Sequence, residues 1–432
     1  MKGRLTSRVS ASAVYNGLNS NFLWMAWSGT ASILNSVLIW IVIARQRSVE
    51  EVAHFAIVMG LYALFFSVVS LGLIPYLVNE ITRRADNKAN GSMSRFLGSS
   101  TVLLIGSGFI LAFLMTLSAS VVSASLEVQL SAAVLSLALI PTGAIALFEA
   151  SSIAQDRTRR IAAITTIENV LRTLVPIAIL LADGGLVAVC LSFAAVRFIA
   201  LGAYLATDVA AVRKFEFCRQ ELKRLLSIAG TFGSTIIVAS FNWQAVLIVL
   251  GYLGTHAETA ALGTTSRFLI PVTILMASYV TVMQPALARL AGSPDEIGRY
   301  LVAKARLPLG AAAAASIASG FLARPVLELL FGMGYGDAAP VLNILALSTI
   351  PFCVVMIASR GLIALSKQRV DLIANVIGAG ICVTLAVVAI PRYGAIGAAA
   401  AQLIAFLAMA LFEVAYLIRA ASNAAVLRPV KA

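Results

Sequence analysis

A carboxylate and a guanidinium stand one helical turn apart in the mainly apolar stretch IENVLRTLVPIAILL, at Glu168 and Arg172. Residues at positions i and i+4 share one helix face, and an acid that precedes its base is the favourable order. Two roles suit this spacing. Either the pair neutralises itself so that the helix can pack, or Glu168 orients Arg172 and the planar guanidinium binds a diphosphate.

Three more arginines interrupt apolar runs. Arg197, in LSFAAVRFIALG, has no carboxylate three or four residues away, so its charge needs a partner on another helix or a ligand. Arg267 and Arg360 occupy two later runs, and Arg360 is near enough to an end for its side chain to extend outward. The acidic residues in comparable positions are Glu149, Glu168 and Glu413. The arginines outnumber these acids, which favours an anionic ligand.

Polar and aromatic residues form a second set of candidates. Asn35, Asn242 and Gln244 lie in two apolar runs and suit either hydrogen bonds to sugar hydroxyls or hydrogen bonds between helices. Trp243 is far enough inside its run to stack on a sugar. Trp40 lies near the end of a run, where tryptophan usually anchors a helix at a membrane interface.

The composition shows which elements must hold these residues. Of 432 residues, 60% are hydrophobic and 12% charged, whereas a soluble chain is about 45–50% apolar and about 25% charged. A helix that crosses a bilayer needs roughly 20 mainly apolar residues. We therefore predict an all-α multi-pass membrane protein with about twelve transmembrane helices. The predicted spans are 22–44, 53–79, 96–122, 130–154, 161–182, 186–207, 226–250, 259–284, 304–323, 339–363, 370–390 and 396–418.

In such a protein, an ionisable side chain within a span normally faces the bundle interior or a wet cavity. We therefore interpret the in-span arginines as candidate substrate-binding residues, with Glu168 in a supporting role. The candidates are Arg172, Arg197, Arg267 and Arg360.

The distribution of Lys and Arg predicts the orientation. Of the 32 such residues, 24 fall on segments that are cytoplasmic if both termini are, and four fall on the opposite loops. This asymmetry follows the positive-inside rule. The net charge of +13 is then explained by loops that lie against anionic headgroups, with no nucleic-acid partner.

A weak internal repeat divides the chain. An offset of 207 aligns Asn35 with Asn242, and an offset of 210 aligns Arg157 with Lys367. We predict two six-helix halves, 1–207 and 225–432, related by a pseudo-two-fold axis along the membrane normal. Residues 208–224 are the cytoplasmic linker, either a helix on the membrane surface or a solvated segment.

The remaining chemical candidates are few. His54 and His256 both fall near outside ends of spans, where proton sensing or a satisfied interfacial hydrogen bond would suit them. The four cysteines have no metal-ligand spacing. The sequence therefore predicts no metal site and no bound cofactor, and it leaves open coupling to the membrane potential, H⁺ or Na⁺.

Several longer stretches resemble one family. The segments LFGMGYGDAAPVLNILALSTIP, GLIALSKQRVDLIANVIG and TSRFLIPVTILMASYVTVMQPALARL are similar to the polysaccharide-transporter branch of the multidrug/oligosaccharidyl-lipid/polysaccharide exporter superfamily. The resemblance implies a bacterial inner-membrane flippase for undecaprenyl-diphosphate-linked oligosaccharides, such as O-antigen, capsular or exopolysaccharide repeat units. It also places at Arg267 an arginine that is often tied to the lipid diphosphate, and it implies polysaccharide polymerase machinery as a partner.

The residues alone point to a transporter by exclusion. No outside loop pairs carboxylates with His or Arg in a catalytic spacing, and no Gly-rich phosphate loop is present, so we expect no enzyme. Two alternatives stay open. A drug or organic-cation antiporter would need a buried carboxylate cluster. A flippase for the peptidoglycan lipid precursor usually has two more C-terminal helices than the twelve predicted here.

Overall fold

The computed structural model describes residues 37–86, 90–155, 157–212, 215–290, 294–365 and 367–426. Within these ranges the regular structure is helical and contains no β-strand. The helices are α2 (Val49–Val68), α3 (Ile74–Asp86), α4 (Asn90–Val122), α5 (Leu126–Ser136), α6 (Leu139–Ala154), α7 (Thr158–Leu181), α8 (Leu186–Val212), α9 (Arg219–Leu253), α10 (His256–Thr265), η1 (Ser266–Phe268), α11 (Leu269–Arg289), α12 (Pro294–Phe331), η2 (Met333–Ala338), α13 (Ala339–Ala364) and α14 (Gln368–Val426).

The number of spans agrees with the sequence prediction. Ten described segments are long and apolar enough to cross a membrane. One of them, α14, contains a sharp break at Gly394, where φ is +54°, so it holds two crossings. The short apolar helix Val37–Gln46 is the described part of the first predicted span, which would be the twelfth crossing. The protein is therefore an all-α, multi-pass membrane protein.

The bounds of several predicted spans differ from those of the helices, and two of these differences are large. The span predicted at 53–79 ends at Val68, and a separate helix starts at Ile74. Leu71 and Gly72 between them both have positive φ, at 50° and 68°, which a continuous helix does not allow. The span predicted at 304–323 lies within a longer helix, α12. Apolar side chains on its outer face are exposed, as a lipid-facing surface requires, with Phe321 81% accessible.

Hydrogen bonds repeat at the predicted offsets. Ser48 and Glu51 form a capping box at the start of α2, and Thr255 and Glu258 form another at the start of α10. These pairs are 207 residues apart. A capping box satisfies two backbone N–H groups that the first helical turn leaves without partners. The two halves therefore start equivalent helices in the same way.

The second repeat concerns a tight turn. The Arg157 N–H donates to the Ser152 carbonyl at 2.8 Å, and the Lys367 N–H donates to the Leu362 carbonyl at 2.8 Å. Both donors and both acceptors are separated by 210 residues. The sequence repeat is thus matched by local backbone geometry in both halves.

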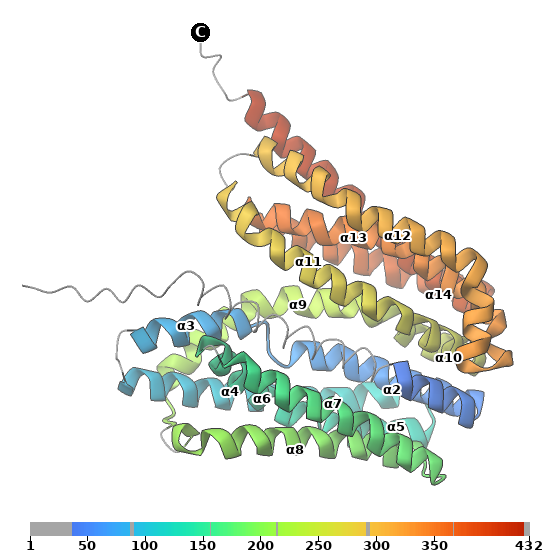
Figure 1. Ribbon diagram of the computed structural model, residues 1–432, viewed down its shortest axis with the longest axis horizontal. Helices are drawn as coiled ribbons and strands as arrows, with labels where there is room; N and C mark the ends of the chain where they lie inside the picture. The colour runs from blue at the N-terminus through green and yellow to red at the C-terminus, as the bar shows by residue number, and fades with distance from the viewer. Residues whose placement is uncertain are drawn as a thin grey trace, which may run out of the picture.

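The two halves pack together at one end and diverge at the other. Figure 1 shows α2 to α8 in one bundle and α10 to α14 in a second, with the bundles in contact where α2 and α10 begin. We call this the closed end and the opposite one the splayed end. One buried apolar cluster at the closed end includes residues of both bundles, such as Phe55 and Leu327. Towards the splayed end each bundle has its own cluster, around Phe96 in one and Phe352 in the other.

Close backbone approach holds the closed end together. A Cβ on Gly263 of α10 would lie 2.6 Å from the Ala56 Cβ of α2 and 3.1 Å from the Trp40 ring. Such small residues let two helices approach closely in a membrane. Trp40 is only 1% exposed here, so the expectation that it anchors the chain at the interface is wrong.

Of the predicted linker 208–224, residues 208–212 end α8, residues 219–224 start α9, and residues 215–218 lie along α4. Residues 215–218 are not helical, and the Cys218 N–H donates to the Ser99 hydroxyl at 3.0 Å. The Glu216 N–H donates to the Ser94 carbonyl at 3.2 Å. For these four residues the surface-helix alternative is wrong, because their backbone is bound to α4. The boundaries of the two halves stay a prediction.

Candidate functional site

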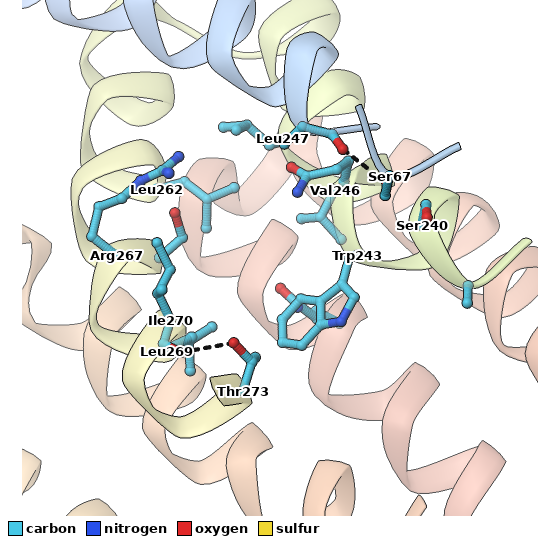
Figure 2. Close-up of a pocket in the computed structure, with 15 residues that line it drawn as sticks. Ser67, Ser240, Trp243, Val246, Leu247, Leu262, Arg267, Leu269, Ile270 and Thr273 are labelled. Carbon is cyan, nitrogen blue, oxygen red and sulfur yellow. Dashed lines mark hydrogen bonds between the residues drawn. The ribbon is translucent and has the colours of Figure 1, made fainter. Parts of the chain in front are cut away.

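A cavity of about 420 Å³ lies where the two bundles begin to diverge. Its walls come from α2, α9, α10, η1, α11 and α14, so both halves contribute. Three of the predicted site residues line it. They are Arg267, Trp243 and Gln244. Figure 2 shows Arg267 on one side of the pocket, across from Trp243, Ser67 and Ser240.

Arg267 owes its position to a break in the helix. It lies in η1, the short 3₁₀ segment between α10 and α11. Pro271 follows four residues later, and a proline ring clashes with the carbonyl at i−4 in a continuous α-helix. The hydroxyls of Thr265 and Ser266 donate to the Ala261 and Gly263 carbonyls, which supports the turn before the break. The α-helix is therefore interrupted by a 3₁₀ turn at the residue that carries the guanidinium.

The guanidinium of Arg267 lies on an aromatic ring and beside the cavity. Its central carbon is 4.3 Å from the centre of the Trp40 ring, and its Nε donates to the Gly263 carbonyl at 3.2 Å. Among the described residues no carboxylate lies within ion-pair distance of it. The cation–π contact offsets part of the cost of burial, but the positive charge is not neutralised. An anion in the cavity would complete the pairing.

Three consecutive residues of α9 take different positions. Trp243 lines the cavity and packs edge-on against Phe352, with ring centres 5.0 Å apart. Gln244 also lines the cavity, with an amide that can donate and accept. Asn242 points away, because it is 3% exposed and its Nδ2 lies 3.0 Å from the Met409 sulfur of α14. For Asn242 the structure shows a contact between helices. Its repeat partner, Asn35, lies outside the described residues.

Glu168 joins two of the predicted arginines. Both of its carboxylate oxygens accept from one terminal nitrogen of Arg197, at 2.7 and 2.8 Å. Arg172 lies 3.6 Å from the same carboxylate. The Arg197 Nε also donates to the Thr142 hydroxyl at 3.0 Å, so the group ties α6, α7 and α8 together. The partner that Arg197 requires thus comes from another helix.

This charged group is set apart from the cavity. Arg172 and Arg197 do not appear among the residues that line it. Instead the Arg172 guanidinium lies 5.1 Å from the Phe193 ring centre, against α8. Arg360 is also elsewhere, on α13, and does not line the cavity. Substrate contact by these three arginines stays a prediction.

Some lining residues give no signal in the sequence. Ser67, Ser240, Thr273 and Gln402 add hydroxyl and amide groups to the walls. Single polar residues of this kind are common at helix contacts in membranes, so their types alone did not single them out. No carboxylate is present among the described residues that line the cavity.

A separate charge network lies at the splayed end of the first half. The Glu80 carboxylate accepts from Arg83 and Arg84, each at 2.8 Å, and Arg84 also donates to Glu221 of α9 at 2.9 Å. Burial works to raise the pKa of Glu80, but the bonds from Arg83 and Arg84 outweigh it and hold that pKa below its usual range. This network fixes α3 to the start of α9.

With this geometry in view, the chain can be compared with known proteins. Residues 42–340 match the family model described as polysaccharide biosynthesis protein. The chain belongs to this family. No curated protein matches it.

Solved structures share the fold of this family member. The lipid II flippase MurJ in an inward closed conformation has a TM-score of 0.74, with 15% identity over 94% of this chain and 90% of that one. An inward-facing multidrug resistance MATE family transporter of the MOP superfamily has a TM-score of 0.72, with 14% identity over 92% and 96%. A MATE transporter of Vibrio cholerae has a TM-score of 0.63, with 16% identity over 95% and 98%.

Together these findings confirm the resemblance found in the sequence. The family match extends over most of the chain, and the fold is that of transporters of the MOP superfamily. The chain is therefore a multi-pass membrane protein of the polysaccharide biosynthesis family, and it has a fold that known transporters share.

Proposed function

We propose that the protein is a flippase that moves a polyprenyl-diphosphate-linked oligosaccharide from the inner to the outer leaflet of the bacterial inner membrane. Its substrate would be an O-antigen, capsular or exopolysaccharide repeat unit on undecaprenyl diphosphate. The observation that carries the proposal is the Arg267 guanidinium, which lies on a cavity shared by both halves and has no carboxylate partner among the described residues.

The lining chemistry fits the two parts of such a substrate. A guanidinium binds phosphate oxygens through paired donors and stays charged at any physiological pH. The Trp243 indole, the Gln244 amide and the hydroxyls opposite suit a sugar, which combines apolar ring faces with hydroxyl groups. The polyprenyl chain would remain in the surrounding lipid.

Transport would follow from rocking of the two halves about this cavity. The structure diverges at the end that the distribution of Lys and Arg assigns to the cytoplasm. A membrane potential contributes about 2.3 kcal/mol per charge per 100 mV. A diphosphate with about two negative charges would therefore be driven outward by about 4–5 kcal/mol when the cell interior is negative.

The cavity disfavours an organic-cation antiporter. Such a protein needs a carboxylate to attract its substrate, and the described lining residues include none. Arg267, which has no carboxylate partner among the residues that the structure describes, would repel a cation. A flippase for the peptidoglycan lipid precursor would use the same diphosphate chemistry, so the sugar must be decided by experiment.

The test uses a strain that lacks this protein, in which lipid-linked oligosaccharide of each leaflet and surface polysaccharide are measured. The strain is complemented with the wild type, Arg267→Ala, Arg267→Lys or Arg299→Ala at equal membrane levels. Arg299 is an exposed cation on α12 and serves as the matched control. We expect Arg267→Ala to reduce flux about 10- to 100-fold, since a hydrogen bond to a charged group contributes about 1.5–3 kcal/mol.

The other variants and outcomes refine the interpretation. Arg267→Lys keeps the charge but loses the paired, planar donors of the guanidinium. Its flux should therefore lie between those of the alanine variant and the wild type. Normal flux in Arg267→Ala would refute the role of the cavity cation. If peptidoglycan precursor accumulates in the null strain, the substrate is that precursor and not a polysaccharide repeat unit. If cationic dyes accumulate, the protein is an antiporter and not a flippase.

A further inference from the structure

The only two histidines of the chain meet at the closed end. His54 lies in the second turn of α2, and His256 is the first residue of α10. Their rings stand edge to face with centres 5.4 Å apart. They are 202 residues apart in sequence and belong to different bundles. This contact therefore crosses between the two halves.

A carboxylate completes the group. Glu50 precedes His54 by one helical turn on α2. One ligand atom from each of Glu50, His54 and His256 lies within 4.8 Å of the others. Glu50 and His256 are exposed, whereas His54 is only 4% exposed. The group thus has a fixed, buried member and two members that can adjust.

The buried histidine presents a free nitrogen to this group. Its Nδ1 lies 2.8 Å from a carboxylate oxygen of Glu127 on α5. Because an ionised carboxylate only accepts, the proton belongs on Nδ1 and the lone pair on Nε2. The Nε2 atom is buried and has no hydrogen-bond partner. The sequence-based expectation of a satisfied histidine is therefore correct for one ring nitrogen only.

We propose that Glu50, His54 and His256 form a binding site for a divalent transition metal of the zinc type, which joins α2 to α10. A carboxylate that accepts from the far nitrogen of a ligating histidine is the usual outer partner of zinc, and Glu127 is placed for that role. Two imidazoles and one carboxylate suit Zn²⁺ and leave a fourth position for water. Calcium and magnesium prefer oxygen ligands, so they are poor candidates.

The geometry requires only a small adjustment. Zinc bonds of about 2.0–2.1 Å place tetrahedral ligand atoms roughly 3.3 Å apart. The present separations of up to 4.8 Å can shorten by side-chain rotation of Glu50 and His256, because both are exposed. His54 would stay in place, held by Glu127. The site departs from the sequence-based prediction of no metal, because the spacing of its ligands along the chain is too long to recognise.

A bound metal would stabilise one arrangement of the two halves. A ligand that binds only the closed arrangement of this end raises its population relative to the open one by a factor of 1 + [L]/Kd. At 100 times Kd that factor is about 100. Metal would thus hold the closed end shut, whatever substrate the cavity carries.

The test uses full-length protein in detergent, purified without a polyhistidine tag. Co²⁺ and Zn²⁺ binding are measured by calorimetry and by the visible absorption of tetrahedral Co²⁺, which Zn²⁺ should displace. We expect one metal ion per chain in the wild type. Glu127→Gln should weaken binding about 10- to 100-fold, as loss of an outer partner does, and His256→Gln should weaken it further. Glu296→Gln, an exposed acid on α12, is the matched control and should bind like the wild type.

A second measurement tests the joining of helices. Hydrogen exchange at the starts of both α2 and α10 should slow with Zn²⁺ in the wild type and not in His256→Gln. The proposal is refuted if the wild type binds no more tightly than His256→Gln, or if Zn²⁺ slows exchange in only one of the two helices. Neither readout depends on transport, so a wrong substrate assignment would leave the result intact.

Discussion

Replacing Glu168 by glutamine leaves two arginines without their counter-charge inside a membrane-spanning bundle. In the folded protein this carboxylate, 5% exposed, is the ion-pair partner of both Arg197 and Arg172. The desolvation of the two guanidinium groups would no longer be offset. Removal of one partner from a buried ion pair costs about 3–5 kcal/mol of unfolding free energy.

The structure also predicts an order among the variants. In Arg197→Met, Arg172 remains as a partner for Glu168, so the loss should be smaller, at about 1–3 kcal/mol for the bonds that disappear. The double variant Glu168→Gln with Arg197→Met removes both charges of the shorter pair. It should lose less stability than the sum of the single variants, because residues in contact are not additive.

The assay is unfolding by a denaturing detergent in mixed micelles, with the exposed Glu296→Gln as the matched control. We expect the largest loss for Glu168→Gln, then Arg197→Met, and no change beyond about 0.5 kcal/mol for the control. If Glu168→Gln matched the control, the ion pair would not contribute to stability. A stable Arg197→Met with no transport would instead indicate contact with substrate.

Three further outcomes follow from other parts of the fold. Gly394→Ala should destabilise the protein by about 2–3 kcal/mol in the same assay, because φ is +54° and the new Cβ would meet a carboxylate of α10; Gly310→Ala, where nothing lies within 4 Å, should not. The folded-state pKa of Glu80 lies below its ordinary value of 4.5. Its contribution to stability should therefore be complete above that pH and disappear as pH falls through the lower folded value, and Glu80→Gln should remove this dependence in unfolding curves. Arg45→Ala removes donors to the carbonyls at the end of α12 and should speed hydrogen exchange there several-fold, without affecting exchange at the splayed end.

The sequence was sufficient to predict the twelve crossings because of a strong physical constraint. In lipid every backbone N–H and C=O of such a segment must be paired within its own helix, so long apolar runs form transmembrane helices. The break between α2 and α3 was missed because its residues, Leu71 and Gly72, are apolar and do not interrupt the hydropathy. Backbone conformation there depends on packing, which hydropathy does not describe.

The candidate site was predictable only in part. Arg197 and Arg267 are each a lone cation in an apolar run, and the hydropathy and the spacing of charges do not distinguish them. Their difference is tertiary, because Glu168 lies opposite Arg197, whereas the described residues place no acid beside Arg267. Trp40 was misjudged for a similar reason. Both faces of a membrane helix are apolar, so position along the helix does not show which face meets protein.

The indole under Arg267 also has an optical consequence. The chain has four tryptophans, and the two in the described part are Trp40, against the cavity cation, and Trp243, on the cavity wall. Indole emission shifts with nearby charge and with access of water. An anion that pairs with Arg267 would change the field at Trp40, and a sugar at the opposite wall would change the solvation of Trp243. Ligand occupancy could thus be followed by tryptophan emission in unlabelled protein. The variants Trp40→Phe and Trp243→Phe would separate the signal beside Arg267 from the signal at the opposite wall of the cavity.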